Sequence, residues 1–292
     1  MGFSSHTPQR FKCRNFSCPV CPPGPLPRLE ANIPAHTYQR ERGHRIVDHI
    51  SHPSTMPTRV RVNMSNQLPA AVLWDMDGTL IDSDPLWGRA EISLMERAGA
   101  PWTQQDVEDF VGASLPSAAE KMREAGLNLS VREIIDHLIA EVAAGVREFG
   151  IPWRPGAREL LEALSEAGVP QALVTMSETP LSSAFIEVLG RNPFHAVVTG
   201  DTVYPHKPEP EPYLKGLRLL REATGLELPA TQVIAIEDST PGTTSAVNAG
   251  LATLGIPHTA AITGRDGLII RETLAGMTPA RLADIIALIH AR

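Results

Sequence analysis

Short apolar runs alternate with amphipathic stretches from residue 153 to the end of the chain, and a further apolar run lies at residues 71–74. Runs of four or five residues are too short for helices and are typical of strands that are buried on both faces. Strands that alternate with helices predict right-handed crossovers and a parallel sheet, so we expect an α/β fold with a Rossmann-like core. The expected strands are 71–74, 171–175, 196–199, 232–236 and 252–254, and the expected core helices are 156–167, 180–189, 211–223, 242–249 and 279–291.

Residues 85–152 interrupt this alternation with helical periodicity alone. Ser130 and Glu133 have the spacing of a capping box at the start of a long helix. We therefore expect an all-helical cap domain inserted between the first two strands, which would act as a lid. Its hinges, at residues 82–85 and 151–156, are both marked by proline. The expected cap helices begin near residues 86, 103, 116 and 130.

The sequence thus divides into three parts: a core of residues 67–84 and 153–292, a cap of residues 85–152, and an extension of residues 1–66. The extension shows no apolar periodicity and holds nine of the 26 prolines, so we expect it to be disordered. We favour the interpretation that translation starts at Met64 or Met56. A functional tail and an organelle transit peptide are the alternatives, since the segment is rich in arginine and poor in acids.

Charge and cysteine content narrow the class of protein. The formal net charge is −7, and residues 1–66 carry nine Lys or Arg against three acids, so the body is strongly acidic. An acidic body offers no footprint for nucleic acid, and no run of 18 apolar residues is present to cross a membrane. Cys13, Cys18 and Cys21 all precede the body, so we expect no disulfide scaffold there and a cytoplasmic protein. A zinc site on these cysteines is an alternative that their irregular spacing disfavours.

Two aspartates after the first expected strand carry a strong chemical signal. Asp75 and Asp77 stand one residue apart, so in extended chain their side chains point to the same side. Parallel α/β sheets bind their ligands at this carboxyl edge. Two carboxylates a few ångströms apart repel each other unless a cation lies between them, and Mg²⁺ prefers such oxygen ligands. The pattern predicts a magnesium site, against the alternative that Gly78 only makes a turn.

Residues 75–83, Asp-Met-Asp-Gly-Thr-Leu-Ile-Asp-Ser, resemble the first motif of the haloacid dehalogenase superfamily of phosphoryl-transfer enzymes. Three later segments resemble the remaining motifs in the same order. Thr175 ends an apolar strand as in the second motif, and Lys207 precedes a proline as in the third. Glu237 and Asp238 match the acidic pair of the fourth. The plain alternatives are a helix-entry hydroxyl, a solvated lysine and a helix N-cap.

The resemblance implies a mechanism in which four of these residues take part. Asp75 would attack phosphorus and form an aspartyl phosphate, and Asp77 would act as general acid and then as general base. Thr175 and Lys207 would stabilise charge on the transferring oxygens. Because each of these residues follows an expected strand, we expect all of them at one edge of the sheet.

The resemblance also implies the contacts of the metal and of the substrate. The expected Mg²⁺ ligands are Asp75, the backbone carbonyl of Asp77, Asp238 and, through water, Glu237. The expected substrate contacts are Thr175, Met176, Ser177, Lys207 and, from the cap, Trp87.

We expect a phosphatase for a small phosphorylated metabolite, with a sugar phosphate favoured, because residues 84–91 resemble sugar-phosphate phosphatases of the superfamily. Trp87 and Arg89 in this stretch either contact substrate or pack within the cap. A sugar phosphomutase similar to β-phosphoglucomutase is the main alternative. It is disfavoured because Trp87 replaces a histidine of that enzyme, and because residues 111–115 lack the cations that grip its second phosphate. A binding protein that has lost catalysis is a third interpretation, although no motif residue is missing. We expect a monomer or weak dimer.

Overall fold

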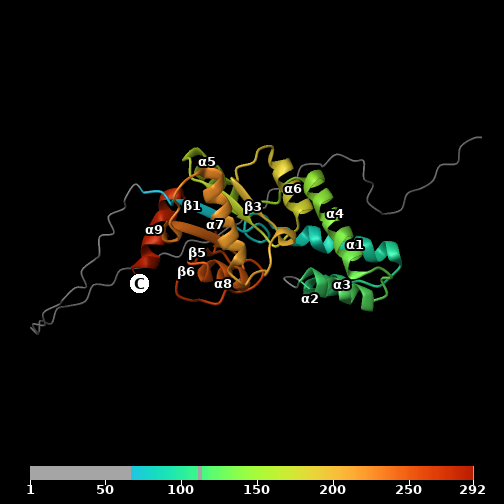
Figure 1. Cartoon of the computed structure of the whole chain (residues 1–292). Coiled ribbons are helices and arrows are strands. Elements are labelled where there is room, and N and C mark those ends of the chain that lie inside the picture. The colour runs from blue at the N-terminus through green and yellow to red at the C-terminus, as the bar shows by residue number, and fades with distance from the viewer. Residues whose placement is uncertain (1–66, 111–113, 292) are drawn as a thin grey trace, which may run out of the picture. The chain divides into compact units, whose positions relative to one another are not determined.

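The computed structural model describes residues 67–110 and 114–291. The predictions of a disordered extension and of cysteine-bound metal fall on residues 1–66 and lie outside the described residues. Six parallel strands form one sheet in the order β3-β2-β1-β4-β5-β6 (Figure 1), which confirms the expected α/β fold. The strands are β1 (Ala71–Trp74), β2 (Gln171–Val174), β3 (Ala196–Val198), β4 (Val233–Glu237), β5 (Ala252–Gly255) and β6 (Leu268–Ile270).

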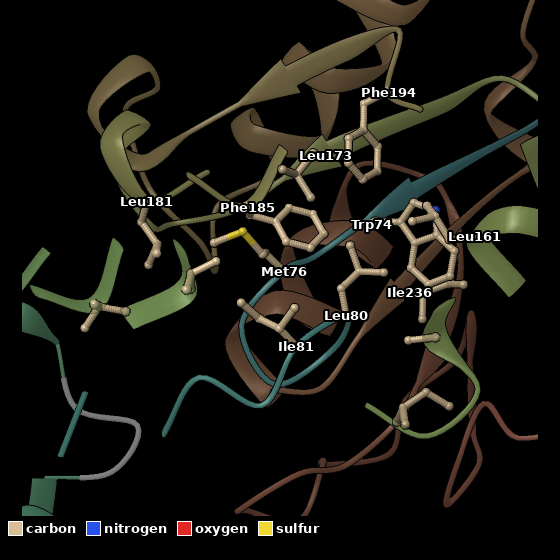
Figure 2. Close-up of a cluster of buried hydrophobic side chains, with 14 of the residues drawn as sticks. Trp74, Met76, Leu80, Ile81, Leu161, Leu173, Leu181, Phe185, Phe194 and Ile236 are labelled. Carbon is tan, nitrogen blue, oxygen red and sulfur yellow. The ribbon is translucent and has the colours of Figure 1, made fainter. Parts of the chain in front are cut away.

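Both faces of the sheet are buried. The core helices are α5 (Ala157–Glu166), α6 (Thr179–Leu189), α7 (Glu211–Thr224), α8 (Thr240–Asn248) and α9 (Pro279–His290). Val72 and Trp74 of β1 belong to a hydrophobic cluster with α5, α6 and α9, whereas Ala71 and Leu73 belong to a second cluster with α7 and α8. Figure 2 shows Trp74 of the first cluster with its neighbours. The alternation of side chains along β1 therefore explains why this strand is apolar at every position.

The cap consists of four helices between β1 and β2 (Figure 1). Ser130 and Glu133 form the expected capping box, in which each side chain accepts a hydrogen bond from the backbone of the other. Within residues 67–110 and 114–291, no helix is long and apolar enough to cross a membrane. The cap helices are α1 (Asp84–Ala98), α2 (Gln104–Phe110), α3 (Leu115–Glu124) and α4 (Val131–Phe149).

Two chain segments connect the cap to the core, and they run side by side. Ile81 and Trp153 form an antiparallel bridge. The backbone N–H of Asp82 donates to the carbonyl of Pro152 at 2.7 Å on the cap side of that bridge. Helix α4 also packs against α6 of the core. The cap is therefore joined to the core at this two-stranded connection and along the contact between α4 and α6.

Two expectations about strands are wrong in detail. Strand β6 was not expected, because its three residues are too few to show a periodicity and lie in an otherwise polar stretch. Strand β4 begins at Val233, one residue late, because a 3₁₀ turn over Ala230–Gln232 precedes it. The strand also extends through Glu237, which makes this acid a fully buried strand residue.

Candidate active site

The structure brings the four motif segments together at the carboxyl edge of the sheet. Asp75 directly follows β1, and its backbone N–H donates to the carbonyl of Ile236 at 3.0 Å. Thr175 directly follows β2, and Asp238 directly follows β4. Lys207 lies before α7 and reaches Asp75 with its ammonium group, 2.8 Å from Oδ1. Parallel topology thus collects groups that lie up to 163 positions apart in the sequence, counted from residue 75 to residue 238.

Lys207 is the buried cation of the site. Its side chain is 6% exposed, and Nζ donates to Asp75, to Glu237 Oε1 at 2.6 Å and to the carbonyl of Val174 at 2.8 Å. Burial alone lowers the pKa of a lysine, but the two carboxylates outweigh burial and raise the pKa of Lys207 above its ordinary value. The lysine is therefore charged and fully engaged, with all three ammonium hydrogens directed at acceptors.

Asp75 and Asp238 carry more negative charge into this site than Lys207 neutralises. Burial raises the pKa of Asp75 to about 7, and the nearby charge of Glu237 adds to the rise. Burial likewise raises the pKa of Asp238 to about 9, with Asp75 and Glu237 as the next contributors. Oδ2 of Asp75 is buried and has no hydrogen-bond partner among the described residues. The raised pKa values mean that the ionised forms of Asp75 and Asp238 are disfavoured in this site. A further cation beside them would stabilise the ionised forms, so the site is suited to bind one.

These residues fit a divalent metal ion. One carboxylate oxygen each from Asp75, Glu237 and Asp238 lies within 4.8 Å of the others. All are hard oxygen donors, which is the donor set that Mg²⁺ prefers. Gly78 keeps the space beside them open, because a Cβ atom there would lie 2.2 Å from Oδ2 of Asp238. Its φ of 80° also favours glycine.

Glu237 differs from the other two acids because the protein already satisfies it. Its Oε1 accepts from Lys207 and from the hydroxyl of Tyr213 at 2.7 Å, and its Oε2 accepts from Ser239 at 3.2 Å. A Cβ on Gly242 would lie 1.9 Å from Oε2, so the glycine lets α8 begin against this carboxylate. Glu237 therefore binds and positions Lys207. Asp75 and Asp238 remain the carboxylates that are available to bind a metal ion.

Asp77 occupies a different environment from Asp75. Oδ1 accepts from the hydroxyl of Ser83 at 2.6 Å, and Oδ2 accepts from Ser177 at 2.7 Å and from Thr175 at 3.3 Å. The Thr175 hydroxyl also accepts from the backbone N–H of Ser177 at 3.0 Å. No lysine or arginine among the described residues pairs with Asp77. Three hydroxyl groups from two segments therefore orient this carboxylate without neutralising it.

The remaining expected substrate contacts lie in the loop after β2 and in the cap. Met176 is half-buried, and its carbonyl lies against Gly200, where a Cβ atom would be 2.1 Å away. Trp87 lies on α1 and packs against the first hydrophobic cluster. Trp87 thus lies in the first turn of α1, directly after the residues that connect the core to the cap.

Sequence reasoning missed a second cluster of titratable groups at the hinge. Nε2 of His258, in the loop after β5, lies 3.1 Å from Asp82 Oδ1 and 3.4 Å from Asp84 Oδ2. Burial raises the pKa of Asp84, and the carboxylates of Asp82 and Asp77 add to the rise. A histidine 176 positions from Asp82 gives no signal in the sequence. Tyr213 and its contact with Glu237 were missed for the same reason, since a helical tyrosine reads as an ordinary core residue.

A family of hydrolases shares the sequence pattern that forms this site. The sequence profile described as haloacid dehalogenase-like hydrolase matches residues 72–256, which is more than half of the chain. The chain therefore belongs to this family, as its motifs indicate.

Particular relatives share most of its length. Hexitol phosphatase B of Escherichia coli (strain K12) is 26% identical over 220 residues, 74% of this chain and 96% of that protein. Phosphoglycolate phosphatase of Pseudomonas savastanoi pv. phaseolicola is 28% identical over 202 residues, 66% of this chain and 71% of that protein. The crystal structure of CbbY from Rhodobacter sphaeroides in complex with phosphate has a TM-score of 0.61 and 24% identity, covering 71% of this chain and 96% of that chain, and supports the fold.

Proposed function

We propose that the chain is a Mg²⁺-dependent phosphatase that hydrolyses a small phosphorylated metabolite, with a sugar phosphate as the favoured class, through an aspartyl phosphate on Asp75. The family and the phosphatase relatives identify it as a phosphoric monoester hydrolase. The observation that carries the finer proposal is the contrast between two aspartates. Asp75 is buried against Lys207 with one unpartnered oxygen, and Asp77 is held by hydroxyls beside it. Such a pair suits a nucleophile and a separate proton carrier.

In the first step the carboxylate of Asp75 attacks phosphorus, and the bond from phosphorus to the ester oxygen breaks. Asp77 donates its proton to that leaving oxygen, which departs as an alcohol. Lys207 stays against Oδ1 of Asp75 and offsets the charge that builds up around the phosphoryl group. The hydroxyl groups of Thr175 and Ser177, which donate to Asp77 in the free protein, would turn to the phosphoryl oxygens when substrate binds.

In the second step water attacks the phosphorus of the aspartyl phosphate. Asp77, now ionised, accepts a proton from that water, and the bond to Asp75 breaks to release inorganic phosphate. Asp75 and Asp238 would hold Mg²⁺, together with the backbone carbonyl of Asp77, and the bound ion would supply positive charge that stabilises the transferring oxygens. Both aspartates return to their initial protonation states, so the cycle is complete.

Hydrolysis of p-nitrophenyl phosphate tests this proposal. We expect turnover that requires Mg²⁺, is abolished by EDTA and is lost in Asp75→Asn. Rapid acid quench followed by peptide mass spectrometry should find phosphate on the peptide that contains Asp75. Turnover that persists in Asp75→Asn, or phosphate on any other residue, would refute the mechanism.

The phosphomutase alternative is separated by product analysis. When β-glucose 1-phosphate is supplied with a glucose bisphosphate primer, a phosphatase releases inorganic phosphate, whereas a mutase forms glucose 6-phosphate. We expect inorganic phosphate as the main product.

A further inference from the structure

A buried carboxylate in the cap has no part in the mechanism above. Glu91 lies on α1 and is 8% exposed. The indole N–H of Trp102 donates to its Oε2 at 3.2 Å, and no other described side chain donates to either oxygen. Burial raises the pKa of Glu91, and the indole N–H offsets only part of that rise. Burial of an acid that has one neutral donor and no cation costs folding free energy. Glu91 therefore points to a role other than stabilising the fold.

Glu91 belongs to a row of residues that starts beside the catalytic carboxylates. Asp84, Trp87 and Glu91 are spaced i, i+3 and i+7, so they share one face of α1, which we call the α1 row. Asp84, at the hinge end, is close enough to Asp77 for that carboxylate to raise its pKa. Glu91 lies two turns further into the cap, about 10 Å along the helix axis. The α1 row therefore leads from the phosphoryl site into the cap.

Each Lys and Arg of the cap already contacts another side chain of the protein. It contains six Lys and Arg residues, and all six lie in the described part of the chain. Arg89 lies over the Phe149 ring, 4.5 Å from its centroid. The other five form ion pairs, which are Arg97 with Glu141, Lys121 with Glu124, Arg123 with Glu120, Arg132 with Asp136 and Glu178, and Arg147 with Glu187.

We propose that Glu91 is a substrate-binding residue that selects a phosphate monoester whose far end carries hydroxyl groups and no second charge. This inference rests on the proposed phosphatase function. A carboxylate accepts hydrogen bonds from hydroxyl groups, and such charge-assisted bonds are among the stronger ones. The same carboxylate repels a carboxylate or a second phosphate at that end of the substrate. Polyol phosphates therefore fit the cap, and phosphocarboxylates and bisphosphates do not.

The test compares three substrates on the full-length protein with Mg²⁺. Sorbitol 6-phosphate carries a neutral polyol end, 2-phosphoglycolate carries a carboxylate, and p-nitrophenyl phosphate carries neither. We expect the wild type to prefer sorbitol 6-phosphate to 2-phosphoglycolate in kcat/KM. In Glu91→Gln, kcat/KM for sorbitol 6-phosphate should fall about 10-fold to 100-fold, mainly through KM. In the same variant the value for 2-phosphoglycolate should rise, and kcat/KM for p-nitrophenyl phosphate, which carries neither hydroxyl groups nor a second charge, should change much less than either.

Two control variants separate substrate binding from a structural role. Glu96→Gln removes an exposed carboxylate from the same helix and should change none of the three values. Trp102→Phe removes the indole donor but keeps the Glu91 charge, so the preference for sorbitol 6-phosphate should persist. The circular dichroism spectrum and the thermal melt report whether each variant is folded.

Two results would overturn the inference while the phosphatase function stands. One is a wild-type preference for 2-phosphoglycolate, and the other is an equal loss on all three substrates in Glu91→Gln. Absence of turnover of every substrate by the wild type would instead refute the proposed function itself.

Discussion

The sheet edge and the cap use the same charged residue types in opposite ways. At the sheet edge, Lys207, Asp75 and Glu237 have side chains that are 6%, 10% and 1% exposed and that share their partners. In the cap, Lys121 pairs with Glu124, and their side chains are 54% and 65% exposed. A buried charge without its partner costs several kcal/mol, whereas an exposed pair contributes about 1 kcal/mol or less. Removal of one charge should therefore cost more stability at the sheet edge than in the cap.

That contrast also separates catalysis from selection. Every group that we place on the reacting phosphoryl follows a core strand or precedes a core helix. Trp87 and Glu91, which share one face of α1 in the cap, are the residues that we propose to contact the part of the substrate that differs between phosphate esters. We therefore expect core substitutions to affect all substrates and cap substitutions to affect some of them.

The largest expected effect comes from Asp75→Asn. The amide is not a nucleophile, so kcat on p-nitrophenyl phosphate should fall by about 10³-fold or more. Asp109→Asn, which changes an exposed aspartate of the cap, is the matched control and should retain wild-type turnover. A comparable loss in both variants would break the distinction between sheet edge and cap.

Asp77→Asn should reveal the proton carrier through its dependence on the leaving group. Loss of a general acid costs about 10² to 10⁴ in rate, so turnover of sorbitol 6-phosphate should fall by that factor. p-Nitrophenolate leaves without a proton, so the first step with p-nitrophenyl phosphate should slow much less. Single-turnover kinetics with both substrates measure the difference. Equal slowing would contradict the assignment of Asp77.

Lys207→Met should destabilise the fold as well as abolish turnover. The substitution leaves Asp75 and Glu237 buried without their cation, which typically costs about 3–5 kcal/mol of the free energy of unfolding. Lys121→Gln removes an exposed cap lysine and should cost about 1 kcal/mol or less. Urea denaturation at pH 7 compares the two. Similar losses would mean that burial does not set the difference between the regions.

The metal-free protein should lose stability as pH rises. The pKa values of Asp75 and Asp238, at about 7 and about 9, lie above the ordinary value of 3.8. A carboxyl group with a raised pKa stabilises the folded state fully below about pH 4, and this contribution is lost as pH rises through about 7 and about 9. Mg²⁺ should therefore raise Tm more at pH 8 than at pH 5. Thermal melts with Mg²⁺ or EDTA measure both shifts, and a larger gain at pH 5 would contradict the proposed metal site.

The smallest expected effect is that of Arg132→Gln. Its guanidinium donates to Glu178 of the core at 2.7 Å and 2.9 Å, but its side chain is 53% exposed. Exposed pairs contribute about 1 kcal/mol or less, so Tm and kcat/KM should change little. Arg147→Gln, at the other ion pair between α4 and α6, is the matched control. A large loss in either variant would show that the cap depends on its ion pairs for its position.

Much of the fold was readable from local pattern. Strands β1 to β5, the core helices, the cap helices and the capping box at Ser130 were predicted, because each depends on residues that are neighbours in the sequence. Strand β6 was missed because three residues carry no periodicity, and its pairing with β5 supplies what its own sequence does not.

The sequence by itself determined which residues we propose for the chemistry, because Asp75, Thr175, Lys207 and Asp238 each stand in a motif of specific residues beside an apolar strand. Only the tertiary structure decided how these groups differ from one another. Burial raised the pKa of Asp75, and contacts with Lys207 and Tyr213 satisfied Glu237. Desolvation and hydrogen bonding depend on neighbours that are distant in the chain, so no local pattern records them.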